Sequence, residues 1–226
     1  MLHQLLRRPA GAASLAVLML LYLAALLAPF LAPYAPNEQS LAHAFHPPTA
    51  LVWQDGRLQV RVYQNVDRAA AEYRPSGASF PLKFLARGQP YSVLGLTLEH
   101  HLFLPDSSDP RHRVYLLGAD GTGRDVYTRL LFGARVSLSI GLIGIIITLG
   151  MGFLVGGLAG YFGGAFDFWA MRLTEFLMAV PALYLLLALR ATLAPHFESA
   201  EMYLLIVAIL AAIGWAGPAR IVRGMA

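Results

Sequence analysis

Cysteine is absent from the 226 residues, so the sequence offers neither a disulfide framework nor a thiolate metal site. Charged residues are scarce as well, at 13% of the chain against about 25% in soluble domains. Hydrophobic residues make up 57%, which indicates that lipid surrounds much of the chain. The basic residues behind the net charge of +4 are spread between apolar tracts, whereas a nucleic-acid-binding face needs them clustered. We therefore expect a lipid bilayer as a partner and no nucleic acid.

Signatures of an active site are also lacking. No Ser-His-Asp set and no pair of carboxylates has the spacing of a catalytic site, so we expect no catalytic residue, no cofactor and no bound metal. His100 and His101 follow Glu99 and invite a metal hypothesis. Adjacent residues on a strand point to opposite faces, so a solvent-facing loop is favoured over a set of metal ligands.

The first long apolar tract predicts a membrane helix near the N-terminus. No charged residue occurs from Pro9 to Asn37, and Ala12 to Ala32 supplies the roughly 20 apolar residues that a spanning helix needs. A cleaved signal peptide is the alternative, because Arg7 and Arg8 precede the tract. Signal cores are shorter, at about 7–15 residues, and end in a cleavage site of small residues. An uncleaved span is therefore favoured.

Three more apolar tracts complete a predicted all-α polytopic membrane protein with four transmembrane helices and a small β-containing insertion. Pro181 is expected to kink the third helix, because proline removes a backbone donor. Arginines flank one set of span ends, whereas the flank between the third and fourth spans, with Arg190, Glu198 and Glu201, has no positive excess. The positive-inside rule therefore places the arginine-rich ends, and with them the N-terminus, in the cytoplasm. The predicted organisation is a cytoplasmic N-terminus (1–10), a first helix (11–33), an extracytoplasmic insertion (34–117), an external amphipathic helix (118–135) and a transmembrane domain (136–226) with spans at about 136–161, 169–193 and 202–219.

The insertion carries strand signals. Asp55-Gly56 lies between two alternating segments, which is typical of a hairpin closed by a type I′ turn. In that register Leu51 and Trp53 share a face with Val60 and its neighbours Leu58 and Val62. A second alternating run over 82–86 is expected to stop at 87–90.

The segment Gly118 to Asp125 resembles a phosphate loop at first sight. A P-loop needs a Lys and then a Ser or Thr directly after its last glycine, and Arg124 and Asp125 stand at these two places. Local physics favours a turn at Asp120-Gly121, with Thr122 capping a helix and Asp125 reaching back. An apolar stripe of Val126, Leu130 and Ala134 then predicts an amphipathic helix on the outer membrane face.

Two features of the apolar tracts predict helix contacts. Gly152, Gly156 and Gly160 recur every four residues, which favours tight helix packing over direct contact with a substrate. Arg172 and Glu175 stand at i and i+3, where they either form an ion pair in the membrane or snorkel separately to the interface.

Three separated motifs, in order, resemble the inner-membrane permease subunits of bacterial dipeptide, oligopeptide and nickel ABC importers. They are LLGADGTGRDVYTRLLFGARVSLSIG, LAGYFGGAFDFWAMRLTEFLMAVP and GWAGPARIVRG, and they cover about half of the chain. The first motif implies an external element of Gly118, Asp120, Gly123, Arg124 and Asp125. The second implies a cytoplasmic turn and third span of Gly160, Tyr161, Gly163, Gly164, Asp167, Met171, Arg172, Glu175 and Pro181, and the third implies a span end with Trp215, Arg220 and Arg223.

The resemblance implies a transport subunit rather than an enzyme. Its implied partners are a second permease subunit, two ATP-hydrolysing ABC subunits and an extracytoplasmic solute-binding protein, in the bacterial inner membrane. Two features depart from the family. The insertion is unusually long, and the cytoplasmic Glu-Ala-Ala loop that couples to the ATPases is absent before Ala226, so we expect a truncated chain that ATP cannot drive alone. The cargo stays open between a peptide, a nickel chelate and another solute. The alternative is a membrane-anchored extracytoplasmic binding or assembly module without transport activity.

Overall fold

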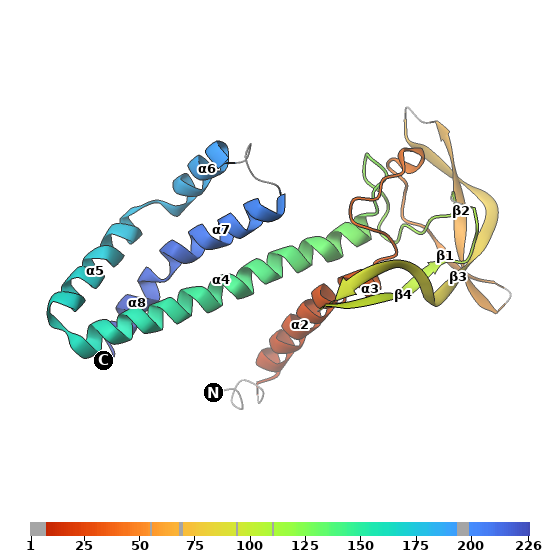
Figure 1. Ribbon diagram of the computed structural model, residues 1–226. Coiled ribbons are helices and arrows are strands. Elements are labelled where there is room, and N and C mark those ends of the chain that lie inside the picture. Colours follow the sequence, from red (N-terminus) through yellow and green to blue (C-terminus); the bar gives the residue numbers. More distant parts are fainter. Residues whose placement is uncertain (1–7, 55, 68–69, 94, 110, 194–198) are drawn as a thin grey trace. The chain divides into compact units, whose positions relative to one another are not determined.

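The computed structural model describes residues 8–54, 56–67, 70–93, 95–109, 111–193 and 199–226 (Figure 1). Arg7, Asp55 and Glu198, which the sequence predictions used, lie outside the described residues. The chain forms two compact units, Met1–Leu138 and Ser139–Ala226. The elements in chain order are α2 (Pro9–Leu26), α3 (Ala28–Leu31), η1 (Leu41–His43), β1 (Leu51–Gln54), β2 (Arg57–Asp67), β3 (Glu72–Val93), β4 (Leu96–Pro105), α4 (Val126–Phe162), α5 (Gly164–Ala179), α6 (Ala182–Leu193), α7 (Ser199–Gly214) and α8 (Ala216–Arg223).

The strands of the first unit form one antiparallel meander in the order β1-β2-β3-β4. Leu51 pairs with Val60 and Trp53 with Leu58, so the predicted hairpin and its register are confirmed. Gly56 has φ +71°, a conformation that glycine adopts without steric cost and that the tight turn requires. Val60 and Phe80 pair across β2 and β3 and are fully buried or nearly so, together with Phe103 and Val114. These four residues form the core of the sheet.

The prediction that the second alternating run stops at 87–90 is wrong. β3 continues through these residues, and the register between β3 and β4 shifts between Arg87 and Tyr91. At such an irregularity a few residues stay unpaired while the strand continues. The segment 88–90, which contains a glycine and a proline, therefore fits within the strand without forming a turn. The result is a strand much longer than the alternation alone predicted.

The predicted all-α class with four spans is also wrong. A four-stranded sheet is a major part of the first unit, because alternating residues over 51–105 bury one face against each other. Among the described residues, three helical segments are long and apolar enough to cross a membrane: Pro9–Leu26, Val126–Phe162 and Leu205–Arg223.

The predicted third span is instead a bent pair of helices. α5 and the following helical segment Leu183–Thr192 diverge by 74°. Val180 has φ −78° and ψ 120°, the extended conformation imposed on a residue that precedes proline. Pro181 therefore breaks the helix at this point, a larger effect than the predicted kink.

α4 is one continuous helix that includes residues 126–135, so the structure shows no separate amphipathic helix before the span. Its 37 residues extend for about 55 Å, which is longer than the roughly 30 Å of hydrocarbon that a helix must cross. Val126 and Leu130 of the predicted stripe are exposed, whereas Leu131 packs against Ala28 and Ala32. The face of α4 that packs against protein is therefore a different face from this stripe, and contact of the stripe with the membrane stays a prediction.

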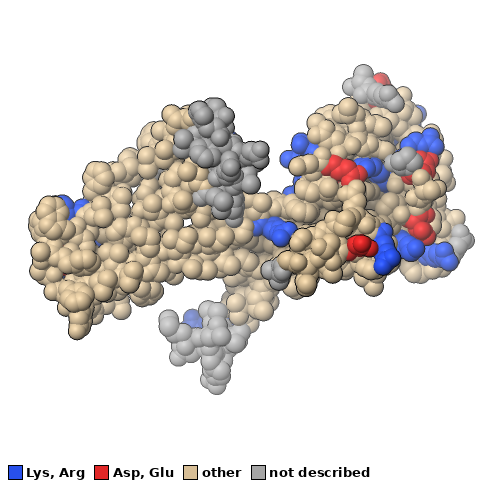
Figure 2. Space-filling model, viewed as in Figure 1, with Lys and Arg blue, Asp and Glu red and all other residues tan. Residues whose placement is uncertain are grey.

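The glycine stripe of α4 faces α8 within the second unit. A Cβ added to Gly152 would lie 2.6 Å from Cβ of Pro218, and one added to Gly156 would overlap the Ala219 carbonyl. The predicted role of these glycines in tight packing is therefore confirmed. Figure 2 shows the acidic and basic side chains gathered mainly over the sheet-containing unit, whereas the visible surface of the apolar helices consists mostly of other residues.

Candidate functional site

Two sets of motif residues have defined surroundings, one in each unit. The first is the Asp120 turn, residues 118–125, which corresponds to the external element of the resemblance. Gly118 and Gly123 have φ +82° and +74°. A Cβ on Gly118 would lie 2.7 Å from the His46 carbonyl oxygen, and one on Gly123 would overlap the Ser40 carbonyl. Both glycines are therefore required by the positive φ and by the close approach of the 40–48 segment.

The carboxylate of Asp120 organises the turn. It accepts hydrogen bonds from the backbone N–H and hydroxyl of Thr122 at 2.9 and 2.8 Å, and from the backbone N–H and Nε of Arg124 at 3.0 and 2.8 Å. Arg129 adds an ion pair at 2.5 Å. Burial raises the pKa of Asp120, but the hydrogen bonds from Arg124 and Thr122 outweigh it and hold the pKa well below the ordinary value. The turn is therefore built around a permanent anion.

Asp125, rather than Thr122, caps the following helix. Oδ2 of Asp125 accepts hydrogen bonds from the backbone N–H of Thr128 at 2.9 Å and from its hydroxyl at 2.6 Å. This is the bond pattern of an N-cap residue and the residue three positions on. Asp125 is only 4% exposed, and burial raises the pKa of its carboxyl although the Thr128 hydrogen bonds lower it. The assignment of Thr122 as the cap was wrong, because its hydroxyl is already donated to Asp120.

A buried polar layer holds the 34–49 segment against the turn. The Tyr34 hydroxyl accepts a hydrogen bond from the Val114 backbone N–H at 2.7 Å, and the Arg113 guanidinium lies 4.8 Å from the Tyr34 ring centre and pairs with Glu38. The His46 ring lies 5.0 Å from that of Tyr115. Burial lowers the pKa of His46 to about 4, although a hydrogen bond to the Pro47 carbonyl opposes this shift.

His101 is not in a solvent-facing loop. It lies on β4 and is 6% exposed, with Nδ1 at 2.8 Å from the Ala32 carbonyl oxygen and Nε2 at 3.0 Å from that of Gln89. The imidazole thus ties Ala32, the residue after α3, to Gln89 on β3. Among the described residues, no group of three or more His, Asp or Glu side chains is arranged to hold a metal ion. Local sequence patterns contain no signal for this tie, because its two carbonyls lie 69 and 12 positions from His101.

The second set forms an open cleft of about 450 Å³ in the second unit, which we name the arginine cleft. Asp167 and Arg223 form a bidentate pair across it, with Nε to Oδ1 at 2.9 Å and Nη2 to Oδ2 at 2.5 Å. Arg172 pairs with Glu175 at 2.7 Å, so the two side chains are in contact, and whether the pair lies inside the membrane or at its interface stays a prediction. Both partners are at least half exposed, and such a pair contributes at most about 1 kcal/mol. The lining residues are Gly164, Asp167, Phe168, Met171, Arg172, Glu175, Arg220 and Arg223.

Most motif residues of the second unit thus converge on one cleft. Phe168 is the lining residue that was not among the site residues named from the motifs, and Arg172 lies over its ring at 5.6 Å. Gly163 and Gly164 have φ +60° and +57° and make the turn from α4 into α5. The remaining motif residues do not line the cleft: Gly160 packs against Ala226, Tyr161 is 82% exposed, Pro181 separates α5 from α6, and Trp215 is buried between α7 and α8.

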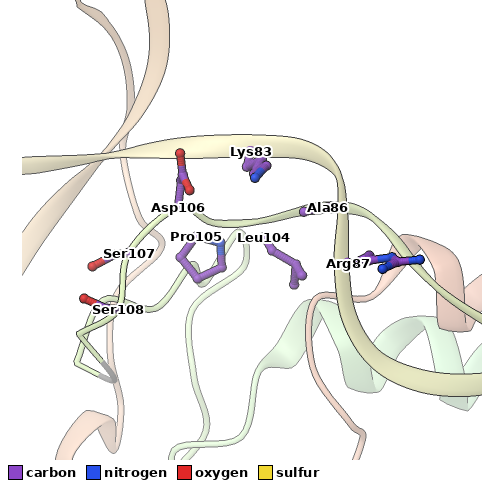
Figure 3. Close-up of a pocket in the computed structure, with 8 residues that line it drawn as sticks. All are labelled: Lys83, Ala86, Arg87, Leu104, Pro105, Asp106, Ser107 and Ser108. Atoms are coloured by element: carbon purple, nitrogen blue, oxygen red, sulfur yellow. The ribbon is translucent and has the colours of Figure 1, made fainter.

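A hollow of about 350 Å³ on the sheet was not predicted from the motifs (Figure 3). It forms where the middle of β3 pairs with the end of β4 and the following loop begins, and the pairing of Leu82 with Pro105 brings Lys83 and Asp106 to it. Its lining is mainly polar: besides Lys83 and Asp106 it includes the charged side chain of Arg87 and the hydroxyl groups of Ser107 and Ser108.

Comparison with known families locates two matching segments. Residues 1–48 match the N-terminal transmembrane domain of oligopeptide transport permease C, and residues 152–226 match the inner membrane component of binding-protein-dependent transport systems. The sheet lies outside both segments. The resemblance inferred from the three motifs is thereby confirmed.

Individual relatives agree. The chain is 38% identical over 135 residues to the dipeptide transport system permease protein DppC of Bacillus subtilis (strain 168), covering 60% of this chain and 38% of the relative. It is 36% identical over 109 residues to the oligopeptide permease OppC of Lactococcus lactis (strain IL1403), covering 48% and 35%. The inner membrane ABC transporter permease YejE of Escherichia coli (strain K12) is 36% identical over 114 residues, covering 50% and 32%. The aligned part is about a third of each relative's length.

Proposed function

We propose that the chain acts as the permease subunit of an ATP-driven importer, because its two ends match the N-terminal domain of oligopeptide transport permease C and the inner membrane component of binding-protein-dependent transport systems. The cargo is a peptide or a similar small solute, and the membrane is the bacterial inner membrane. The observation that carries the proposal is the ordered match of both ends of the chain to peptide-permease families. The convergence of motif residues on the arginine cleft supports it.

The proposed subunit has no catalytic role of its own. ATP is hydrolysed on two ABC subunits, and a second permease subunit completes the pathway. An extracytoplasmic binding protein delivers the solute. These partners follow from the family and from the relatives' names, which describe permease proteins of dipeptide and oligopeptide transport systems. Conformational change in the ATPases reaches the solute pathway through the helices of the permease.

The proposed topology places the N-terminus in the cytoplasm. α2 then leads outward to the sheet and the Asp120 turn, and α4 leads back inward. The arginines of the arginine cleft support this direction, because the positive-inside rule places such residues on the cytoplasmic side. The contact of Gly160 with Ala226 brings the end of α8 to the same end of the second unit as the end of α4.

Peptide uptake tests the proposal. The protein containing this chain is expressed with its partner subunits in a bacterial host that lacks its own peptide permeases, and accumulation of a labelled dipeptide or oligopeptide is measured. We expect energy-dependent accumulation that an ATPase-inactive partner abolishes. Asp167→Ala removes the bidentate partner of Arg223 and should reduce uptake, whereas Asp109→Ala, which removes an exposed loop pair with Arg111, should not. Correctly inserted protein that takes up no peptide would refute the proposal.

A second function is favoured by one observation. The sheet lies outside both family segments and carries its own polar hollow (Figure 3). A membrane-anchored extracytoplasmic binding or assembly module would use this surface without transport. Peptide binding to the purified chain without partners, lost in Lys83→Ala and Arg87→Ala, would favour this function over the permease.

A further inference from the structure

The arginine cleft adjoins an apolar groove on α5, and we propose that the two together bind one anionic phospholipid. Its phosphate would lie at Arg220 and Arg172, and an acyl chain would follow the groove. This inference rests on the membrane location of the chain and not on import.

The charges of the arginine cleft favour an anion. Three arginines face two carboxylates, and Asp167 engages Arg223 through both of its oxygens. Arg172 bonds Glu175 through one guanidinium nitrogen, Nη1. The hydrogen-bond contact of Arg220 is with the sulfur of Met178 at 3.7 Å, and no carboxylate of the described residues lies within ion-pair distance of it. The cleft therefore has an excess of one positive charge, centred on Arg220.

The apolar groove has a volume of about 600 Å³ and shares Arg172 and Glu175 with the arginine cleft. Its apolar lining consists of Trp169, Leu173 and Phe176, which are 69%, 49% and 65% exposed. Their spacing of four and three residues places them on one stripe of α5. Arg172 lies at the border between this stripe and the polar one.

A phospholipid fits both features at once. The guanidinium group binds phosphate oxygens with strong charge-assisted hydrogen bonds. Tryptophan is enriched where the hydrocarbon meets the headgroups, because its ring is apolar and its N–H is polar. A free anion would use the cleft but leave the groove empty, and a neutral lipid would use the groove but leave Arg220 without a counter-charge. An anionic phospholipid therefore satisfies the charge and the apolar surface together.

Lipid retention tests this proposal in the absence of peptide and nucleotide, so its result is independent of transport. The purified chain is equilibrated in mixed micelles with phosphatidylglycerol or phosphatidylcholine of the same acyl chains, and the bound lipid is counted by native mass spectrometry. We expect phosphatidylglycerol to be retained several-fold more than phosphatidylcholine. Arg220→Gln should remove most of this difference.

Control variants and a chain-free competitor separate the contributions of the arginine charge, the apolar groove and the lipid headgroup. Arg190→Gln removes the same charge from an exposed position on α6 and should leave retention unchanged. Trp169→Ala should weaken retention of the lipid, and glycerophosphoglycerol, which has the headgroup without acyl chains, should not displace it. Equal retention of the two lipids, an unchanged Arg220→Gln variant, or complete displacement by the chain-free headgroup would overturn the proposal. Circular dichroism of each variant shows whether the helices are intact.

Discussion

His46 couples the folded first unit to pH. Its side chain is 5% exposed, and burial lowers its pKa from 6.5 to about 4. The folded state therefore favours the neutral imidazole, so the stabilisation is complete above pH 6.5 and is lost as the pH falls toward 4. The loss can reach about 3 kcal/mol. NMR of histidine-labelled protein in micelles should show one ring titrating near pH 4. That resonance should vanish in His46→Gln, and a midpoint near 6.5 would contradict the expectation.

Asp120 stabilises its turn as an anion, and the variant Asp120→Asn tests this role. The amide oxygen can take the place of Oδ1, but the NH₂ group would then replace Oδ2 as the acceptor for Arg124 and Arg129 and would face their guanidinium groups without a negative charge. We expect a loss of about 1–3 kcal/mol in the free energy of unfolding and faster hydrogen exchange at the Thr122 and Arg124 amides. The matched control is Asp109→Asn, whose carboxylate pairs with Arg111 in an exposed loop. Equal effects of the two substitutions would show that the turn does not depend on its charge.

At the scale of elements, adjacent glycines of α4 provide a sharp comparison. A Cβ on Gly156 would overlap the backbone of Ala219 on α8, whereas one on Gly157 would meet no atom within 4 Å. Gly156→Ala should separate the two helices and destabilise the second unit by about 1–3 kcal/mol. Gly157→Ala should be neutral or slightly stabilising, since alanine favours a helix over glycine by about 1 kcal/mol. Thermal unfolding in detergent measures both, and similar melting temperatures would contradict the packing.

Local patterns predicted elements well where the decisive residues are neighbours in sequence. The hairpin at Gly56 and the glycine stripe were predicted because a turn and a helix face each depend on a few adjacent residues. The continuation of β3 through Gly88 depends on pairing with β4, which the alternation of β3 alone does not contain. Proline predicted an interruption at Pro181, but its presence alone does not give the size of the 74° bend.

The arginine cleft shows the same limit at the scale of a site. The motifs supplied nearly all of its residues, but its geometry requires Arg223 of α8 to reach Asp167 of α5, 56 positions earlier. Phe168 was missed because nothing in its local sequence distinguishes it from the other exposed aromatics of α5. The motifs therefore named most of the residues that line the cleft, and the fold determined which of them meet.

At the scale of the whole molecule, the proposed topology can be tested without background labelling, because the chain contains no cysteine. Leu117→Cys, beside the Asp120 turn, and Met225→Cys, after α8, introduce single thiols at positions that are 49% and 82% exposed. A membrane-impermeant maleimide should label Leu117→Cys in intact spheroplasts and Met225→Cys only after permeabilisation. α4 crosses the bilayer in this topology, and Ala226 lies against Gly160 near the inner end of α4, so the two thiols should face opposite compartments. Labelling of Met225→Cys alone in intact spheroplasts would show that α4 runs in the opposite direction, and labelling of both variants would show that α4 does not separate the two positions. Either result would contradict the proposed location of the arginine cleft on the cytoplasmic side.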